Sequence, residues 1–230
     1  MEMSSNTPRK GLRRAVIDFL VVVFGILAAF GLDASWDRFI ENREETRILL
    51  ALQEEFSQNQ SGVANAVRRH REFVEWADAF LAPRDSSTPT DSLVQYLARL
   101  SRGWVTFNSP NGTTEALLRG GRLPTLQDFE LQRMLAAWPG SMADLAESEG
   151  RTIKAYDDLS LFVASESLFP INTRVVRNEF LEFEKEVLTD PRIANLIIRR
   201  RIEEGEALTD SERVAAEIDS ILERIQRLVR

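Results

Sequence analysis

The residue types that carry out most protein chemistry are scarce in this chain. Among its 230 residues there is one histidine, His70, and there is no cysteine. A thiol nucleophile, a disulfide bond and a thiolate metal site are therefore impossible, and no metal site can use two histidines. No Glu-x-x-His sequence occurs either, which excludes the usual carboxylate-bridged di-iron bundle. We predict no metal site and no cofactor.

Motifs that would support catalysis are also missing. There is no GxSxG nucleophile motif, and a Ser-His-Asp site would have to use His70. The sequence RGGR at residues 119–122 has neither the lysine of a phosphate-binding loop nor a strand before it, so it is typical of the end of a helix. We therefore predict that the protein is not an enzyme and has no catalytic residues.

One group of carboxylates has the spacing of a binding site. Glu179, Glu182 and Glu186 share a face of a helical pattern, where they could hold a divalent cation or a basic partner. Phe180 and Phe183 mark the opposite, buried side of this pattern. An ordinary solvated helix face is the favoured interpretation.

The distribution of charge argues against nucleic-acid binding. Residues 1–14 carry a net charge of +3, so the remaining chain carries −10 in a protein whose total is −7. Binding to phosphate backbones is driven by the release of counterions from a basic face, which an acidic body lacks. The one dense basic cluster, residues 199–201, is followed at once by Glu203, Glu204 and Glu206 and is typical of a solvated helix face.

Residues 15–34 have the composition of a membrane-spanning helix. The 18 residues from 15 to 32 contain a single charge, Asp18, and as a helix they are about 27 Å long, close to the bilayer core of about 30 Å. Asp18 lies one turn inside the basic flank, where its carboxylate can reach the headgroups and pair with Arg14. Trp36 lies where an interfacial aromatic residue anchors the other end. The residues that we expect to mark the membrane boundaries are Arg13, Arg14, Asp18 and Trp36.

Two alternatives remain for this segment. A cleaved signal peptide has its best cleavage candidate at residues 29–31, but the helical pattern runs through it. A proton or ion relay at Asp18 would need intramembrane partners, which a single span offers only in an oligomer. Gly25 and Ala29 have the small-xxx-small spacing that lets two spans pack closely, although small residues are common in spans.

The charges on either side of the span predict its orientation. Four basic residues precede the span, whereas acidic residues predominate at positions 33–41. The positive-inside rule then places the N-terminus in the cytoplasm. We expect the chain beyond the span to lie outside the cytoplasm.

Two stretches of the chain carry a family resemblance. Residues 15–59, AVIDFLVVVFGILAAFGLDASWDRFIENREETRILLALQEEFSQN, open with an acidic residue and a Val/Ile-rich span, and continue through a Trp into a charged helix. Residues 112–138, GTTEALLRGGRLPTLQDFELQRMLAAW, follow a looser Thr, Leu, Gly-x-Leu, Asp and aromatic pattern, from which Pro124 departs. Both stretches are similar to a family of uncharacterised bacterial membrane proteins, known only as a domain of unknown function. The resemblance implies a single-span inner-membrane protein with a helical domain of unknown role, and it offers no catalytic residues to carry over. The matching positions in the first stretch are Asp18, Gly25, Trp36, Leu52, Glu55 and Asn59.

A regular helical pattern follows the span. Residues of one face recur every three or four positions from 49 to 80, which is the heptad pattern of a helix packed along another helix. Asn59 and His70 are its polar members, and such residues fix register or oligomeric state at some loss of stability. For His70, pH sensing is a further alternative. The members of this seam are Leu49, Leu52, Phe56, Asn59, Val63, Ala66, His70, Phe73, Ala77 and Phe80.

Turn and capping signals divide the middle of the chain. The polar segment 82–91 predicts a turn, after which Asp91 caps a short helix. Residues 103–114 are predicted to form a loop, and Thr114 begins a helix that the glycine pair at 120 and 121 ends. Two further helices are predicted, one over 126–138 that Thr125 begins and one over 140–168.

The last third of the chain contains two predicted helices. Asp190 caps a helix whose first residue is Pro191. Thr209 and Glu212 form a capping box that begins the final helix. This helix is the natural partner of the first seam, either within one chain or across a dimer. Its own seam contains Val214, Ile218, Ile221, Ile225 and Leu228.

These patterns together predict an all-α protein in three parts. Residues 1–14 form a basic cytoplasmic tail, and residues 15–34 form a transmembrane signal-anchor helix. Residues 35–230 form a helical domain that consists of a long arm over 35–82 and a bundle over 91–230.

The patterns favour an interaction or scaffold protein of the bacterial inner membrane, with a single span and with its C-terminal domain in the periplasm or otherwise outside the cytoplasm. Its expected partners are the membrane and either a second copy of the chain or a helical envelope protein, and not nucleic acid. The alternative is a small-ligand-binding bundle that serves a separate transporter or sensor. The wide apolar face and the aromatic loop around Trp104 and Phe107 suggest this second function.

Overall fold

The structure is a computed structural model that describes residues 9–82, 90–101, 103–166, 188 and 190–230. All regular structure in these residues is helical, which confirms the all-α prediction. The elements are α1 (Arg9–Leu81), α2 (Thr90–Leu100), α3 (Gly112–Arg119), the 3-10 turn η1 (Leu123–Thr125), α4 (Phe129–Glu166) and α6 (Pro191–Val229).

The chain divides into two compact units between Ile48 and Leu49. Unit 1 holds the N-terminal part of α1, and unit 2 holds residues 49–81 of α1 together with α2, α3, α4 and α6. Residues 49–81, predicted as part of the long arm of the helical domain, belong to the same unit as the bundle, whereas residues 35–48 of that arm belong to unit 1.

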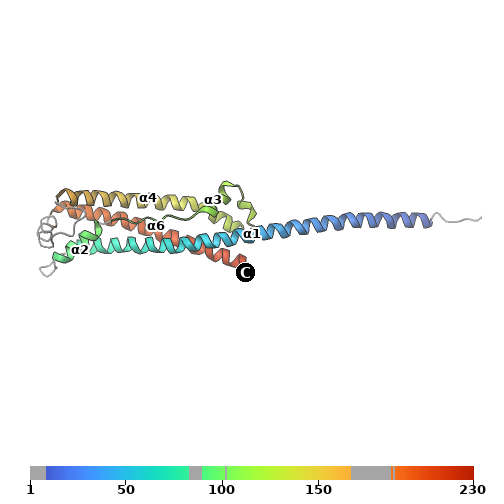
Figure 1. Ribbon diagram of the computed structural model, residues 1–230, viewed down its shortest axis with the longest axis horizontal. Coiled ribbons are helices and arrows are strands. Elements are labelled where there is room, and N and C mark those ends of the chain that lie inside the picture. Colours follow the sequence, from blue (N-terminus) through green and yellow to red (C-terminus); the bar gives the residue numbers. More distant parts are fainter. Residues whose placement is uncertain (1–8, 83–89, 102, 167–187, 189) are drawn as a thin grey trace, which may run out of the picture. The chain divides into compact units, whose positions relative to one another are not determined.

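In unit 2, α1 and α6 pack in opposite directions (Figure 1). Gln60 donates a hydrogen bond to Asp219 (2.6 Å), and Arg71 pairs with Glu212 (2.6 Å), which lies earlier in α6. As the residue numbers rise along α1, the numbers of their partners on α6 fall, so the two helices are antiparallel. The partner of the first seam is therefore α6 of the same chain.

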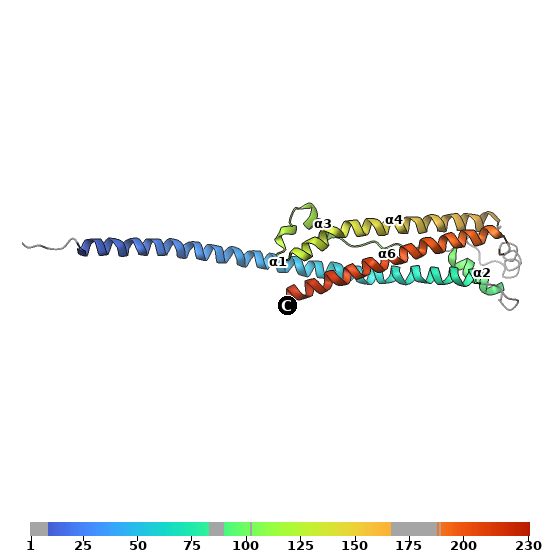
Figure 2. The ribbon, with the colours of Figure 1, turned by 180° about the vertical axis from the view of Figure 1, so that it is seen from behind.

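α4 is the third long helix of unit 2, and it also runs antiparallel to α6 (Figure 2). Asp144 pairs with Arg213 (3.5 Å), whereas Asp158 pairs with Arg199 (2.7 Å). Because both α1 and α4 oppose α6, they are parallel to each other. A parallel pair needs a long connection, and the segment with α2, α3 and η1 supplies it.

The seam predicted for positions 49–80 is confirmed. All ten of its members are buried, with exposed fractions between 0 and 4%. The final seam is buried as far as Ile225, but Leu228 is 39% exposed because it lies in the last turn of α6. Further along the bundle, Phe73 and Phe80 pack with residues of α2, α4 and α6. The buried members of this apolar core are Phe73, Ala77, Phe80, Leu93, Val94, Leu97, Leu100, Leu159, Leu188, Ile193 and Ile197.

The prediction of two helices across residues 126–168 is wrong, because α4 continues through Pro139. Proline removes one backbone donor and usually ends a helix. Here Leu135, Trp138 and Leu145 are all buried on the same side, so packing holds both halves in line. Pro139 itself is exposed. The helix begins at Phe129 and not after Thr125, which lies in η1.

The predicted capping box is also wrong, because α6 is continuous from Pro191 to Val229. Thr209 Oγ1 donates to the carbonyl of Gly205 (2.9 Å) inside the helix and does not cap a new one. Ala207 and Ser211 are fully buried on either side of Thr209, so one continuous face packs against the other helices.

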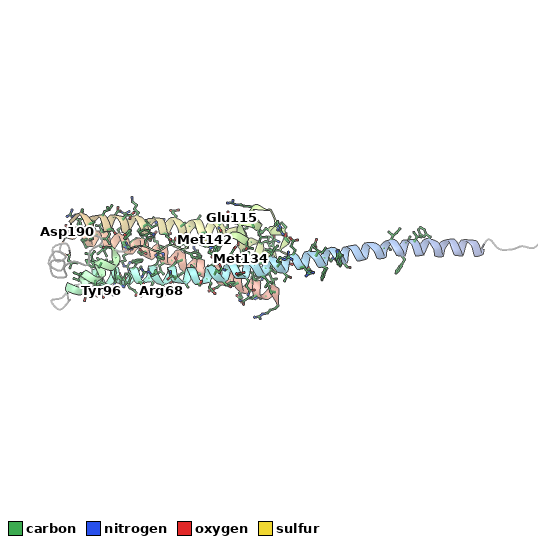
Figure 3. All side chains as sticks on the ribbon, in the orientation of Figure 1. Arg68, Tyr96, Glu115, Met134, Met142 and Asp190 are labelled. Carbon is green, nitrogen blue, oxygen red and sulfur yellow. The ribbon has the colours of Figure 1, made fainter. Side chains whose placement is uncertain are left out.

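Two other local predictions are confirmed, whereas α2 begins at Thr90 with Asp91 inside it, and α3 begins at Gly112 and not at Thr114. Asp190 caps α6 by accepting a hydrogen bond from the Arg192 N–H (2.8 Å), with Pro191 in the first turn. Gly120 ends α3, and Gly121 follows with φ of 62°, a conformation that glycine adopts readily. The positions of Asp190 and of Tyr96 on α2, at the same end of unit 2, are shown in Figure 3.

Among the residues that the structure describes, no helix is both long enough and apolar enough to cross a membrane.

Candidate functional site

An extended segment, residues 103–111, lies against the long helices of unit 2, and we call it the strap. Side chains of three helices bind its main chain. Arg200 of α6 donates to the carbonyl of Gly103 (2.7 Å), and Asn59 of α1 donates to the carbonyl of Pro110 (2.9 Å). Between them, Glu149 of α4 accepts the N–H of Phe107 (2.8 Å). The strap is therefore held through its backbone by buried polar residues.

The side chains of the strap alternate between the bundle and solvent. Phe107 is 6% exposed, and its ring lies 2.9 Å from the position that a Cβ on Gly62 would take. Trp104 is half exposed and its ring centroid is 5.1 Å from that of Tyr156. The loop predicted as a possible ligand site thus packs onto the bundle, with Phe107 filling the space beside Gly62.

Four ionisable residues behind the strap form a buried group, which we call the charged cluster. His70 Nδ1 lies 2.6 Å from Glu204 Oε2, and His70 Nε2 lies 3.9 Å from Glu149 Oε1. Arg200 Nη2 lies 3.3 Å from Glu204 Oε1. Each of these four residues is no more than 3% exposed. The cluster connects α1, α4 and α6 at one level of the bundle.

Aromatic rings enclose the Arg200 guanidinium. Its Cζ lies 4.6 Å from the ring centroid of Phe73 and 5.3 Å from that of Tyr156. Burial lowers the pKa of Arg200, while the charges of Glu204 and Tyr156 oppose this change. Because the guanidinium group is a very strong base, the side chain stays charged. The cluster therefore contains one permanent cation.

The surroundings of His70 favour its protonated form. Burial acts to lower the pKa of His70, but the hydrogen bond to Glu204 and the negative charges of Glu204 and Glu149 outweigh burial, and the net result is a raised pKa. Protonated His70 and Arg200 then balance the two carboxylates. A deprotonated His70 leaves one buried negative charge without compensation.

The cluster is not fully hydrogen-bonded within the described part of the protein. His70 Nε2, Glu204 Oε1, Arg200 Nε and Arg200 Nη1 have no hydrogen-bond partner there. Most buried polar atoms in proteins have one, and buried ion pairs contribute little stability unless their remaining polar atoms are satisfied. The cluster is thus better suited to fixing the arrangement of helices and strap than to maximising stability.

A related contact lies one turn before Asn59 on α1. Glu55 accepts the N–H groups of Thr113 (2.6 Å) and Thr114 (3.2 Å) at the start of α3. The helix has no side-chain cap of its own at Asn111. The carboxylate of Glu55 supplies the negative charge and the acceptors that a helix N-terminus favours.

The chemistry open to this site is limited by burial. No member of the cluster presents a reactive atom to solvent, so a substrate has no access to them in this conformation. Among the described residues there is also no group of three or more His, Asp or Glu side chains placed to hold a metal ion. The charged cluster can bind the strap and respond to the charge of His70.

The two polar seam residues predicted from the sequence, Asn59 and His70, are both buried and both act toward the strap. Asn59 binds the strap directly, whereas His70 lies near Glu149, which binds it, and beside Glu204, which pairs with Arg200. The prediction of a solvated face is wrong for Arg200 and Glu204. The signal that could have found them is the 4-3 spacing of the final seam, which continues backward without a break. The buried positions are Ile193, Ile197, Arg200, Glu204, Ala207, Ser211, Val214, Ile218, Ile221 and Ile225.

The predicted membrane residues are only partly described. Gly25 and Trp36 lie on the helical backbone of α1, with Trp36 63% exposed and its ring centroid 6.1 Å from that of Phe39. The side chains that lie outside the described ones are those of Arg13, Arg14, Asp18 and Ala29. The carboxylates Glu179, Glu182 and Glu186 also lie outside the described residues.

Comparisons with protein-family models, with curated proteins and with solved structures found no match to this chain.

Proposed function

We propose that the protein is a membrane-anchored helical interaction protein of the bacterial cell envelope. One observation carries the membrane part of the proposal. In unit 1, large apolar side chains of α1 are exposed at five described positions between 19 and 27. These are Phe19 (67%), Val22 (60%), Phe24 (74%), Ile26 (51%) and Leu27 (62%).

The distribution of these side chains around α1 supports a membrane environment. Successive residues of an α-helix are turned by about 100°, so these five positions cover more than half of the circumference. A helix that is apolar on most sides is normally buried, either in a protein core or in a bilayer. With the basic residues that precede the segment, the N-terminus is proposed to face the cytoplasm and unit 2 to face the other side.

The burial of the charged cluster supports an interaction role for unit 2. Its ionisable groups hold helices and strap together and are hidden from solvent, so the surface of the bundle is the part available to a partner. Because α6 of the same chain covers the seam of α1, the partner is proposed to bind outside the seam.

Membrane anchoring is tested by fusing to Arg230 a reporter that is active only outside the cytoplasm, followed by fractionation of washed membranes. We expect reporter activity in the membrane fraction. The double substitution Val22→Arg/Ile26→Arg should abolish it, because a central arginine is costly in a bilayer, by about 2.5–3.5 kcal/mol.

The matched control is Ser57→Arg/Ser61→Arg, which places two arginines at the same spacing on exposed positions of unit 2. It should leave both activity and fractionation unchanged. Reporter activity in the soluble fraction, or equal behaviour of the two double variants, would contradict the membrane anchor.

The interaction role needs its own measurement. Crosslinking in native membranes, followed by mass determination of the full-length protein in mild detergent, should recover a complex with a second copy or with a helical envelope protein. A strictly monomeric protein with no crosslinked partner would rule out this role.

A further inference from the structure

We propose that the charge on His70 controls whether the strap stays bound to the helices of unit 2. The strap and His70 do not touch through their side chains. Two series of polar contacts connect His70 to the strap, one through α4 and one through α6. Both end on main-chain groups of the strap.

The first connection runs through Glu149. Its Oε1 accepts the Phe107 N–H at 2.8 Å and lies 3.9 Å from His70 Nε2. One carboxylate oxygen therefore faces both the histidine and the strap. A positive His70 stabilises the negative charge that the Phe107 N–H binds.

The second connection runs through Glu204 and Arg200. His70 Nδ1 lies 2.6 Å from Glu204 Oε2, and the other oxygen of that carboxylate is 3.3 Å from Arg200 Nη2. The same Nη2 donates to the Gly103 carbonyl at 2.7 Å. Any shift in how Glu204 divides its charge between His70 and Arg200 reaches the first residue of the strap.

The charge balance gives the direction of the effect. With His70 protonated, two cations face two carboxylates. With His70 neutral, Arg200 alone faces Glu149 and Glu204, and one negative charge remains in a site that is no more than 3% exposed. A buried charge without a partner is strongly unfavourable, and opening the site to water relieves this cost. The strap is the element whose release exposes Glu149 without separating two long helices.

The groups that face His70 are few. Glu149 faces it from α4, and Glu204 faces it from α6 with Arg200 behind. None of residues 103–111 is ionisable, so the strap itself adds no titrating group. Because the bound-strap state raises the pKa of His70, that state binds the proton more tightly. The strap is therefore held fully below the ordinary pKa of about 6.5 and is released as the pH rises through the raised pKa.

The experiment measures hydrogen exchange of the full-length protein in detergent micelles between pH 6 and 9, corrected for the intrinsic pH dependence of exchange. The readout is the peptide that contains Phe107. Its protection should fall by about tenfold per pH unit between pH 6.5 and the pKa of His70, and then become level. Because His70 is the only histidine, selective labelling of its ring gives that pKa directly by NMR.

Two variants separate this mechanism from a general effect of pH. Glu149→Gln keeps an acceptor for the Phe107 N–H but removes one carboxylate, so neutral His70 leaves no excess charge. In this variant the strap should stay protected across the range, and the pKa of His70 should fall. In His70→Gln the protection should be low at every pH and should show no step.

The control region is the peptide over residues 214–225 of α6, whose exchange should show no step. Parallel loss of protection in the strap and in this peptide would mean that the proton is linked to unfolding of the whole bundle, and this would overturn the proposal. A step that is unchanged in Glu149→Gln, or no step in the wild type across the pKa of His70, would overturn it as well.

Discussion

Glu55 on α1 caps helix α3, although 59 residues separate it from Thr114, whose hydroxyl donates to Glu55 Oε1 at 2.5 Å. The same carboxylate accepts two backbone N–H groups in the first turn of α3. Glu55 lies in residues 15–59, and Thr114 lies in residues 112–138. The structure brings those two stretches into direct contact.

Replacing this cap should destabilise unit 2. We expect Glu55→Ala to lower the free energy of unfolding by about 2 kcal/mol, at the upper end of N-cap losses, because the N–H groups of α3 lose a buried acceptor. Chemical denaturation followed by circular dichroism measures this. Glu54→Ala, at the exposed neighbouring position, is the control and should change stability by less than about 0.5 kcal/mol. Equal losses in the two variants would show that the cap contributes nothing.

The contact between Gly62 and Phe107 predicts an unusual response to a helix-favouring substitution. A Cβ at Gly62 would lie 2.9 Å from Phe107 Cε2, so Gly62→Ala should destabilise the protein despite alanine's higher helix propensity. In a Phe107→Leu background the same substitution should lose most of that penalty, because the ring atom is gone. Denaturation of the wild type, the two single variants and the double variant gives the free energy of interaction between positions 62 and 107.

Gly150 is the matched control for this cycle. It lies inside α4 with nothing within 4 Å of an added Cβ. Gly150→Ala should stabilise the protein by about 1 kcal/mol, the difference in helix propensity. A stabilising Gly62→Ala would show that the strap does not pack on α1 as described.

Arg200 should be far more important to stability than its neighbour Arg199. Arg200→Met leaves Glu149 and Glu204 facing only His70, and we expect a loss of about 3–5 kcal/mol in the free energy of unfolding. Arg199→Met breaks the partly exposed pair with Asp158 and should lose no more than about 1 kcal/mol.

The double variant Arg200→Met/Glu204→Gln shows whether charge balance is the cause. The charges of its cluster are balanced again, with one cation, His70, and one carboxylate, Glu149. The double variant should therefore recover more than half of the free energy of unfolding that Arg200→Met loses. Thermal or chemical denaturation at pH 6 measures all three proteins. Losses that simply add would indicate that lost packing of Arg200 on Phe73, and not charge, explains the effect.

The contact between Asp128 and Arg224 predicts a loss of stability in acid. Asp128 accepts a hydrogen bond from Arg224 Nη2 (2.6 Å) and one from the Leu131 N–H (2.7 Å) at the start of α4. The hydrogen bond from Arg224 is the main cause that lowers the pKa of Asp128 below 3.8. The resulting stability is complete above pH 3.8 and is lost as the pH falls through the lowered pKa.

We therefore expect the stability of the wild type to fall more steeply than that of Asp128→Asn as the pH drops below 4. Denaturation midpoints between pH 7 and 2.5 measure the difference. Glu130→Gln, which affects the exposed pair with Arg133, should follow the wild-type curve closely. Parallel curves for the wild type and Asp128→Asn would show that Asp128 does not contribute to acid sensitivity.

The sequence by itself determined the elements that depend on local periodicity. The seam from Leu49 to Phe80 was predicted residue by residue and is buried throughout, because a helix repeats every 3.6 residues and places such positions on one face. The caps at Asp190 and Gly120 were also predicted, since they depend on neighbouring backbone groups. The absence of cysteine and the single histidine excluded whole classes of site.

The tertiary structure decided everything that depends on contacts between distant residues. Pro139 and Thr209 carry local signals for helix ends, yet packing of both flanking faces keeps α4 and α6 continuous. Arg200 and Glu204 are charged and were assigned to solvent, but their places on the α6 seam bury them. Only the fold brings His70 into the same cluster as Arg200, 130 residues later in the chain, and places the strap across that cluster. Propensity and periodicity act within a few helical turns, whereas charge and hydrogen bonding act wherever distant segments of the chain come together.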